Sequence, residues 1–340
     1  MARAPKRKSA RSALAPALWA AKAWMPVFRA MAAPNFFAPG DAGRVVEVAN
    51  FGANPGALRM FVYAPAKKKL APGAPLIVVL HGCGQDAAMF ARNSGWIALA
   101  ERLGAALLLP EQTARNSAGR CFNWYQPGDV RRGAGEAKSI RQMVRAAAAR
   151  FRSDPRRVYI VGLSAGGAMA AALLAAYPTV FAGGGVVAGM PVGAAFGGAS
   201  ALLRMHRADR FTTRALLADA ALRAAPPTVR PRVWPKISIW QGGRDRTVDP
   251  RNAEALAAQW TALQGFDDSA GVETEPRPGI RRRVWSTKRG AVVEFWALAD
   301  MGHGFPVDSS TSEGGRSGFC VLDVGWSAAR HMAQFWGIDS

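Results

Sequence analysis

A chain of 340 residues is long enough for one large α/β domain or two small ones. Half of its residues are hydrophobic and only 20% are charged, which provides a sizeable core and argues against global disorder. The formal net charge of +21 favours anionic partners, but the basic residues are scattered, and neither zinc-finger spacing nor an aromatic–basic RNA motif is present. We therefore expect a basic, solvated surface and no nucleic-acid partner.

The first 42 residues differ in composition from the rest of the chain. A basic run, Lys6-Arg7-Lys8, precedes an Ala/Leu/Trp-rich segment over residues 13–31, which Lys22 interrupts. A basic start before an apolar stretch is typical of a signal peptide, whereas the aromatic and basic residues also fit an amphipathic extension that binds anionic surfaces. We expect a disordered or amphipathic extension and keep a targeting segment as the alternative.

Strands and helices are expected to alternate through the remainder, residues 43–340. The expected strands cover 44–49, 58–63, 75–80, 105–109, 158–161, 180–190, 233–240 and 291–297, and the expected helices cover 88–102, 136–151, 168–177, 249–263 and 324–336. A long loop separates 111 from 133, and an Ala/Gly/Arg-rich, lid-like insertion occupies about 191–231. This order predicts one doubly wound, mostly parallel sheet with two antiparallel strands at its N-terminal edge.

The most informative stretch is Val158-Tyr-Ile-Val-Gly-Leu-Ser-Ala-Gly-Gly167. An apolar β-branched run is followed by a G-x-S-x-G pattern and then by a segment rich in Ala, Leu and Met. Strand, tight turn and helix in this order are the context of a nucleophile elbow. Gly162 and Gly166 lack a Cβ and would let strand and helix approach closely. Ser164 is therefore the predicted nucleophile.

A serine nucleophile needs a base and an acid that orients the base. In α/β-hydrolases, these follow the serine in the order acid, then histidine. His303 lies in a glycine-flanked loop directly after an expected strand, unlike His206 and His331, so we predict that it is the base. Asp245 follows the strand at 233–240 and is the predicted acid. Asp249, directly before a proline, is more typical of a helix N-cap, and Asp300 is a weaker alternative.

The oxyanion hole requires two backbone N–H groups. One is expected from Ala165, directly after the nucleophile, and the other from Cys83 or Gly82, in the loop after the strand at 75–80. His81 is expected to orient this loop and not to act as a base.

The chain has three cysteines, Cys83, Cys121 and Cys320, and four histidines. No pair of cysteines has C-x-x-C spacing, and with four histidines the chain offers no recognisable zinc set. We expect neither a metal nor a cofactor. An odd number leaves at least one thiol free unless it pairs between chains. No stretch approaches the ~20 apolar residues of a membrane span.

Several motifs together resemble the polyhydroxybutyrate depolymerase family of esterases. They are Leu80-His-Gly-Cys-Gly-Gln85, Cys121-Phe-Asn-Trp-Tyr125, Gly162-Leu-Ser-Ala-Gly-Gly-Ala-Met169, Tyr177-Pro-Thr-Val-Phe181, Trp240-Gln-Gly242, Gly302-His-Gly304 and the closing Leu322-Asp-Val-Gly325 and Phe335-Trp-Gly337. The similarity covers residues 45–337. It implies an α/β-hydrolase fold, no metal, and hydrolysis of short-chain hydroxyacid polyesters or related esters.

Transferred by motif, the resemblance supports Ser164, Asp245 and His303 as the triad, and it implies a Cys83–Cys121 disulfide. Such a bond would indicate an oxidising compartment, extracellular or periplasmic. Trp124, Tyr125 and Met190 could line an acyl pocket or belong to the core.

We therefore expect a serine esterase for hydroxyalkanoate polyesters or oligomers. The alternatives are a feruloyl or acetyl esterase for polysaccharides, a peptidase or lipase on the same framework, and a non-catalytic binder of polyanions or membranes. The oligomeric state is left open.

Overall fold

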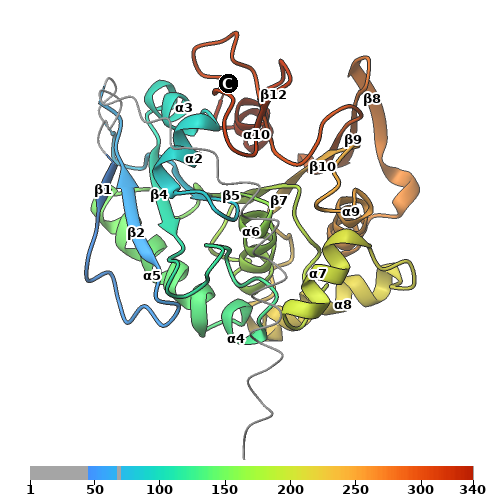
Figure 1. Ribbon diagram of the computed structural model, residues 1–340, viewed down its shortest axis with the longest axis horizontal. Helices are drawn as coiled ribbons and strands as arrows, with labels where there is room; N and C mark the ends of the chain where they lie inside the picture. The colour runs from blue at the N-terminus through green and yellow to red at the C-terminus, as the bar shows by residue number, and fades with distance from the viewer. Residues whose placement is uncertain (1–44, 67–69, 340) are drawn as a thin grey trace, which may run out of the picture.

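The computed structural model describes residues 45–66 and 70–339, so the predictions for residues 1–42 lie outside it. A ten-stranded sheet crosses the molecule in the order β1-β2-β4-β3-β5-β6-β7-β10-β9-β8 (Figure 1). Its strands are β1 (Val45–Glu47), β2 (Arg59–Tyr63), β3 (Leu76–Leu80), β4 (Ala106–Glu111), β5 (Val158–Leu163), β6 (Gly183–Val187), β7 (Lys236–Gly242), β8 (Val272–Arg277), β9 (Ile280–Thr287) and β10 (Gly290–Leu298). A separate parallel pair is formed by β11 (Phe305–Val307) and β12 (Val321–Asp323).

The six strands from β4 to β10 in the middle of the sheet are parallel. The expected antiparallel pair, β1 and β2, closes the N-terminal edge. Central strands such as β3 are buried along their whole length, as a parallel sheet covered on both faces requires.

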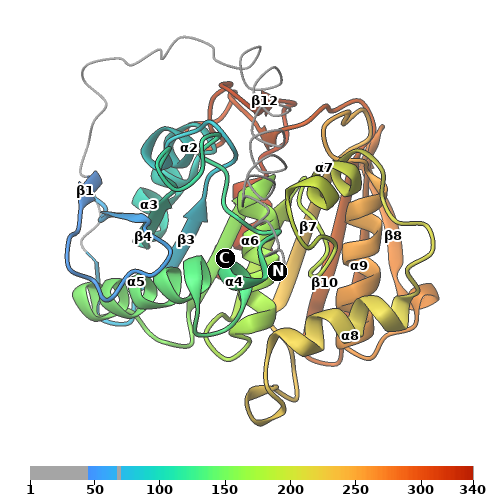
Figure 2. The same ribbon diagram turned by 60° about the horizontal axis from the view of Figure 1, so that its bottom comes forward.

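Helices cover both faces of the sheet (Figure 2). They are α2 (Ala87–Asn93), α3 (Trp96–Leu103), α4 (Pro127–Val130), α5 (Gly135–Phe151), α6 (Ala165–Ala176), α7 (Gly198–His206), α8 (Arg214–Ala224), α9 (Arg251–Leu263) and α10 (Ala328–Trp336), with short 3-10 helices at Pro227–Val229 and Asp268–Ala270. Alternate residues of one strand serve opposite cores: Val78 joins the cluster under α5, α6 and α9, and Ile77 the cluster under α2, α3 and α10. The doubly wound arrangement predicted from the sequence is confirmed.

Two features differ from the prediction. The expected helix at 88–102 is two helices, because Gly95 between them has a φ of +85° and a Cβ there would lie 2.6 Å from Glu313 O. The antiparallel edge strands β8 and β9 were not expected. Their sequence is rich in charge, and Arg282 on β9 pairs with the buried Glu294 on β10 instead of remaining a solvated basic residue.

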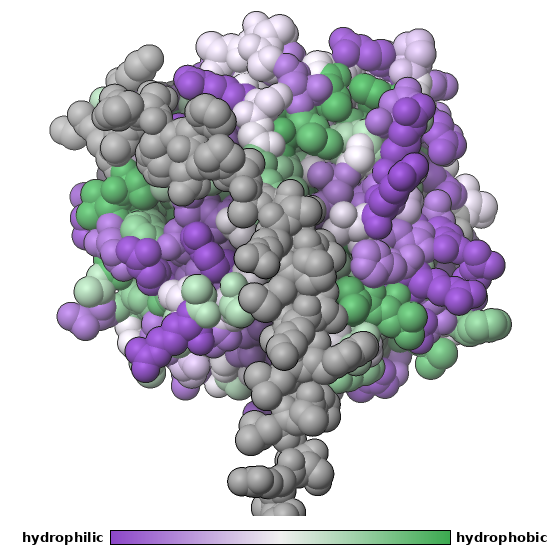
Figure 3. All heavy atoms as spheres, in the orientation of Figure 1, coloured by the Kyte–Doolittle hydropathy of each residue, from purple (hydrophilic) through white to green (hydrophobic). Residues whose placement is uncertain are grey.

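The insertion at about 191–231 contains α7 and α8. Figure 3 shows hydrophobic residues at the surface over these two helices, where Phe196, Leu203, Phe211 and Leu216 are exposed. Within the described part of the chain, no helix is both long and apolar enough to cross a membrane.

Candidate active site

Ser164 lies at the sharp turn between β5 and α6. Its φ of 55° and ψ of −118° are unusual for a residue with a side chain, and its N–H donates to Val187 O at the end of β6 (2.8 Å). A Cβ on Gly162 would lie 2.2 Å from Gly166 O, and one on Gly166 would lie 2.4 Å from His81 O. Both glycines are therefore required for the close approach of strand, helix and the neighbouring loop.

Asp245 and His303 come together from loops that are 58 residues apart in sequence. His303 Nδ1 lies 2.8 Å from Asp245 Oδ2, and both side chains are largely buried. Backbone bonds from Gly243 N to Leu298 O (2.8 Å) and from Arg244 N to Met301 O (2.9 Å) hold the two loops together.

The Asp245 carboxylate accepts hydrogen bonds on both oxygens. Oδ1 accepts from the N–H groups of Thr247 and Val248, each at 2.8 Å, and Oδ2 accepts from Gln241 Nε2 at 3.0 Å as well as from His303. Burial acts to raise the pKa of Asp245, but the hydrogen bond and charge of His303 and the two backbone donors lower it below its usual value. The carboxyl group is thus held ionised beside the histidine.

The other candidate acids have different partners. Asp249 pairs with Arg251 and accepts from Ala208 N (3.1 Å), and the hydrogen bond from Arg251 is the main reason that its pKa is lowered to about 2. Asp300 pairs with Arg244 at the surface. Neither contacts His303 among the described residues.

The alternative histidines also lie elsewhere. His206 is exposed at the end of α7, and His331 stacks on Trp326, with ring centroids 4.6 Å apart.

Ser164 shares one edge of the sheet with the Asp245–His303 pair. Strands β5, β6, β7 and β10 are consecutive and parallel, so the loops that follow β5, β7 and β10 leave the same edge. Bonds from Ser164 N to Val187 O and from Ala188 N to Trp240 O (2.9 Å) connect the elbow to the end of β7. No hydrogen bond joins Ser164 Oγ to His303 within the described residues.

The loop after β3 supplies a candidate oxyanion donor. Gly82 N–H donates to Gln85 Oε1 (2.7 Å) and Gly84 N–H to Gly119 O (2.9 Å), whereas Cys83 N–H has no partner among the described residues. Ala165 N–H, at the first position of α6, is one of the donors that a helix leaves unsatisfied. Of the two alternatives left open by the sequence, this geometry favours Cys83 over Gly82.

Cys83 and Cys121 form a disulfide that ties this loop to the long loop after β4. Cys320 is the free cysteine of the described residues, and burial raises the pKa of its thiol to about 11.

His81 is fully buried beside this loop. Its Nδ1 contacts Gly82 O (2.7 Å), and its Nε2 accepts from Gln112 N (3.1 Å). Burial lowers its pKa to about 4, so the ring is neutral near pH 7. These contacts agree with a loop-orienting side chain.

The three residues suggested for an acyl pocket pack into the larger core. Trp124 and Met190 are almost wholly buried, and Tyr125 is half-buried with its ring 5.6 Å from that of Trp124. Sequence reasoning did not single out Gln85, Gln241 or Glu136, although Gln85 and Gln241 lie in the motifs quoted above.

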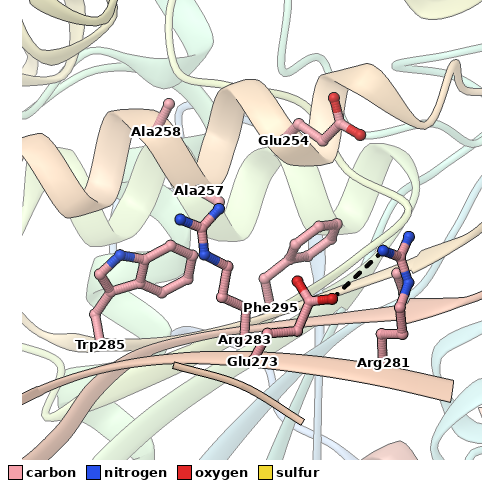
Figure 4. Close-up of a pocket in the computed structure, with 9 residues that line it drawn as sticks. Glu254, Ala257, Ala258, Glu273, Arg281, Arg283, Trp285 and Phe295 are labelled. Atoms are coloured by element: carbon pink, nitrogen blue, oxygen red, sulfur yellow. Dashed lines mark hydrogen bonds and ion pairs between the residues drawn. The ribbon is translucent and has the colours of Figure 1, made fainter. Parts of the chain in front are cut away.

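A separate cavity of about 260 Å³ lies between α9 and strands β8 to β10 (Figure 4). Trp285 and Phe295 are apolar residues of its lining, and Glu273 forms an ion pair with Arg281 there (3.5 Å). None of the triad candidates lines it, so this cavity is not part of the candidate site. No group of three or more metal-ligating side chains is present among the described residues.

A nucleophile elbow, an Asp–His pair at the same sheet edge and unbonded backbone donors define an esterase-type α/β-hydrolase. The structure is similar to that of an acetyl xylan esterase from Aspergillus awamori, with a TM-score of 0.73 at 22% identity over 87% of this chain and 100% of the other. This likeness supports the fold.

Residues 58–282 match the family model described as Esterase PHB depolymerase, and the chain belongs to this family. It is 38% identical over 317 residues to poly(3-hydroxyalkanoate) depolymerase C of Paucimonas lemoignei, covering 92% of this chain and 73% of the relative. It is 28% identical to feruloyl esterase B of Talaromyces funiculosus (79% and 75% covered) and 29% identical to acetylxylan esterase A of Aspergillus oryzae (72% and 80% covered). The chain is accordingly a carboxylic-ester hydrolase.

Proposed function

We propose that this esterase hydrolyses short-chain hydroxyalkanoate polyesters or their oligomers through an acyl-enzyme formed on Ser164. The observation that carries the proposal is the 2.8 Å contact of His303 Nδ1 with Asp245 Oδ2, at the sheet edge that also bears the strained Ser164. This contact leaves Nε2 of His303 as the nitrogen available to the serine.

In the first half of the reaction, His303 removes the hydroxyl proton of Ser164 as the oxygen attacks the ester carbonyl. The N–H groups of Cys83 and Ala165 donate to the oxyanion that develops on the carbonyl oxygen. Asp245 fixes the tautomer of His303 and stabilises its charged form. The proton then passes from His303 to the departing alcohol, which leaves an ester of Ser164.

In the second half, His303 takes a proton from water as that water attacks the acyl-enzyme. The acid is released, and Ser164 recovers its proton from His303. None of these reaction steps requires a metal or a cofactor.

The substrate class rests on the relatives. Identity is 38% to the poly(3-hydroxyalkanoate) depolymerase and 28–29% to the feruloyl and acetylxylan esterases. An aliphatic hydroxyacid ester is therefore favoured over an aromatic or carbohydrate ester.

The Cys83–Cys121 disulfide supports an extracellular or periplasmic location, because disulfides persist in oxidising compartments.

The test is turnover of p-nitrophenyl acetate, butyrate and octanoate, and of 3-hydroxybutyrate oligomers, by the wild type and by Ser164→Ala. Wild-type turnover of the short esters and oligomers should fall to background in Ser164→Ala, while the control Ser312→Ala, at an exposed serine, keeps full activity. Equal melting temperatures would show that the fold is intact. Activity retained in Ser164→Ala would contradict the mechanism, and faster turnover of methyl ferulate or acetylated xylan than of the oligomers would contradict the substrate class.

A further inference from the structure

The oxyanion loop after β3 contains a glutamine whose side chain is bonded at both ends. Gln85 is 2% exposed. Its Oε1 accepts from Gly82 N at 2.7 Å, and its Nε2 donates to Phe319 O at 2.6 Å. A buried amide with both ends satisfied at short distances has a single favourable orientation. The Gln85 side chain is thus held in one orientation inside the loop.

The first of these bonds determines which backbone donors remain available. Because Gln85 Oε1 occupies the Gly82 N–H, and Gly119 O occupies the Gly84 N–H, the Cys83 N–H between them is left for a ligand. The orientation of the Cys83 N–H therefore depends on an acceptor that Gln85 provides.

The second bond connects the loop to the part of the chain that carries His303. Phe319 lies 234 residues from Gln85 in sequence, and its ring packs 3.4 Å from where a Cβ of Gly84 would stand. The carbonyl of the next residue, Cys320, accepts a hydrogen bond from Phe305 N (2.9 Å), and Phe305 lies two residues after His303. One side-chain amide thus joins the oxyanion loop to the segment that follows the base.

We propose that Gln85 is a positioning residue for the oxyanion hole, and that its amide fixes the Cys83 N–H toward the developing oxyanion by bonding Gly82 N and Phe319 O. The inference rests on the proposed function, because it assigns Gln85 a role in the same acyl transfer. Gln85 itself does not contact the reacting atoms. It acts through the Cys83 N–H, which binds the transition state more strongly than the ground state.

The test compares wild type with Gln85→Met, which has a similar size but neither a strong acceptor nor a donor. We expect kcat for p-nitrophenyl butyrate to fall about 10- to 100-fold with KM within about twofold, since loss of one oxyanion donor lowers kcat by about 10²- to 10³-fold and here the donor is displaced, not removed. The affinity for an alkyl trifluoromethyl ketone, whose hemiketal with Ser164 carries the oxyanion, should weaken by the same factor as kcat/KM. A purely structural role would not produce this parallel loss.

Gln259→Met is the matched control. Gln259 is equally buried and bonded at both ends, but its partners lie before α7 and on α8: Val192 N and O, and Leu217 O. It should lose stability and keep the kcat and the ketone affinity of the wild type.

Gln85→Glu covers the case in which Gln85→Met does not fold. It keeps an oxygen for Gly82 N but sets the other oxygen against the Phe319 carbonyl, so kcat and ketone affinity should again fall together. Wild-type kcat and ketone affinity in a folded Gln85 variant would overturn the inference, as would a fall in kcat with unchanged ketone affinity. A wild type that neither hydrolyses the ester nor binds the ketone would overturn the proposed function as well.

Discussion

Two buried carboxyl groups, in different parts of the molecule, accept a similar number of hydrogen bonds, but their pKa values are shifted in opposite directions. Asp245 accepts two backbone N–H groups, the Gln241 amide and His303. Glu136, at the start of α5, is fully buried and accepts from three donors in the long loop after β4: Gln112 Nε2 at 2.6 Å, Asn116 Nδ2 at 3.2 Å and Asn123 N at 2.9 Å.

The pKa values of the two groups move in opposite directions. Burial raises the pKa of Glu136 to about 8, because its three N–H donors do not offset the loss of hydration and Asp129 adds a like charge. Burial also acts to raise the pKa of Asp245, but there the hydrogen bond and charge of His303, together with the backbone N–H groups of Val248 and Thr247, lower it below its usual value. Neutral donors do not offset burial at Glu136, whereas at Asp245 a neighbouring histidine that can carry a positive charge adds to the neutral donors.

Removing the charge of Asp245 is expected to have the largest effect on activity. Asp245→Asn should lower kcat by about 10⁴-fold, because an asparagine favours the wrong tautomer of His303 and does not stabilise its charged form. Steady-state turnover of p-nitrophenyl butyrate measures the effect. Asp249→Asn is the control and should retain most activity; a larger loss there than in Asp245→Asn would identify Asp249 as the acid instead.

A second carboxylate beside Asp245 should have a smaller effect. Gln241→Glu replaces the donor 3.0 Å from Asp245 Oδ2 with a like charge, which raises the pKa of the pair and disturbs the contact with His303. We expect kcat to fall about tenfold or more at neutral pH, an energetic cost of about 1.4 kcal/mol or more. Gln264→Glu adds the same charge near Trp234 O, away from the triad, and should leave kcat unchanged. Equal kcat values in the two variants would contradict a role for Gln241 in maintaining the Asp245–His303 contact.

The raised pKa of Glu136 should make the stability of the protein depend on pH. Its pKa in the folded state, about 8, exceeds its usual 4.5, so the folded state binds the proton more tightly and the free energy of unfolding falls as pH rises between these values. For one proton the slope is at most about 1.4 kcal/mol per pH unit. Urea unfolding of the wild type and Glu136→Gln at pH 5, 6.5 and 8 should give a shallower pH dependence in the variant. Identical slopes would show that Glu136 stays ionised.

The smallest expected effect concerns the thiols. Without reductant, a thiol reagent should find one free thiol per chain, Cys320, and react with it slowly in the folded protein because burial raises its pKa to about 11. The unfolded, unreduced chain should react quickly and still give one. Three free thiols would show that Cys83 and Cys121 are reduced.

Much of this organisation is local in sequence. The β-branched run, the G-x-S-x-G turn and the following Ala-rich helix place Ser164 at an elbow, because each step depends on neighbours within a few residues. The alternation of strands and helices likewise gave the parallel sheet. The prediction of a single helix at 88–102 was wrong for an equally local reason, because Gly95 has a positive φ.

The pairings that complete the site are not local. His303 meets Asp245 across 58 residues, and Gln85 meets Phe319 across 234. The burial of Glu136 also depends on the packing of distant segments. So does the formation of the edge strands β8 and β9. The sequence alone determined which chemical groups are present and at which strand ends they lie. Which of these groups meet, and how far each is removed from water, depends on the folded chain, because distance and desolvation are properties of its packing.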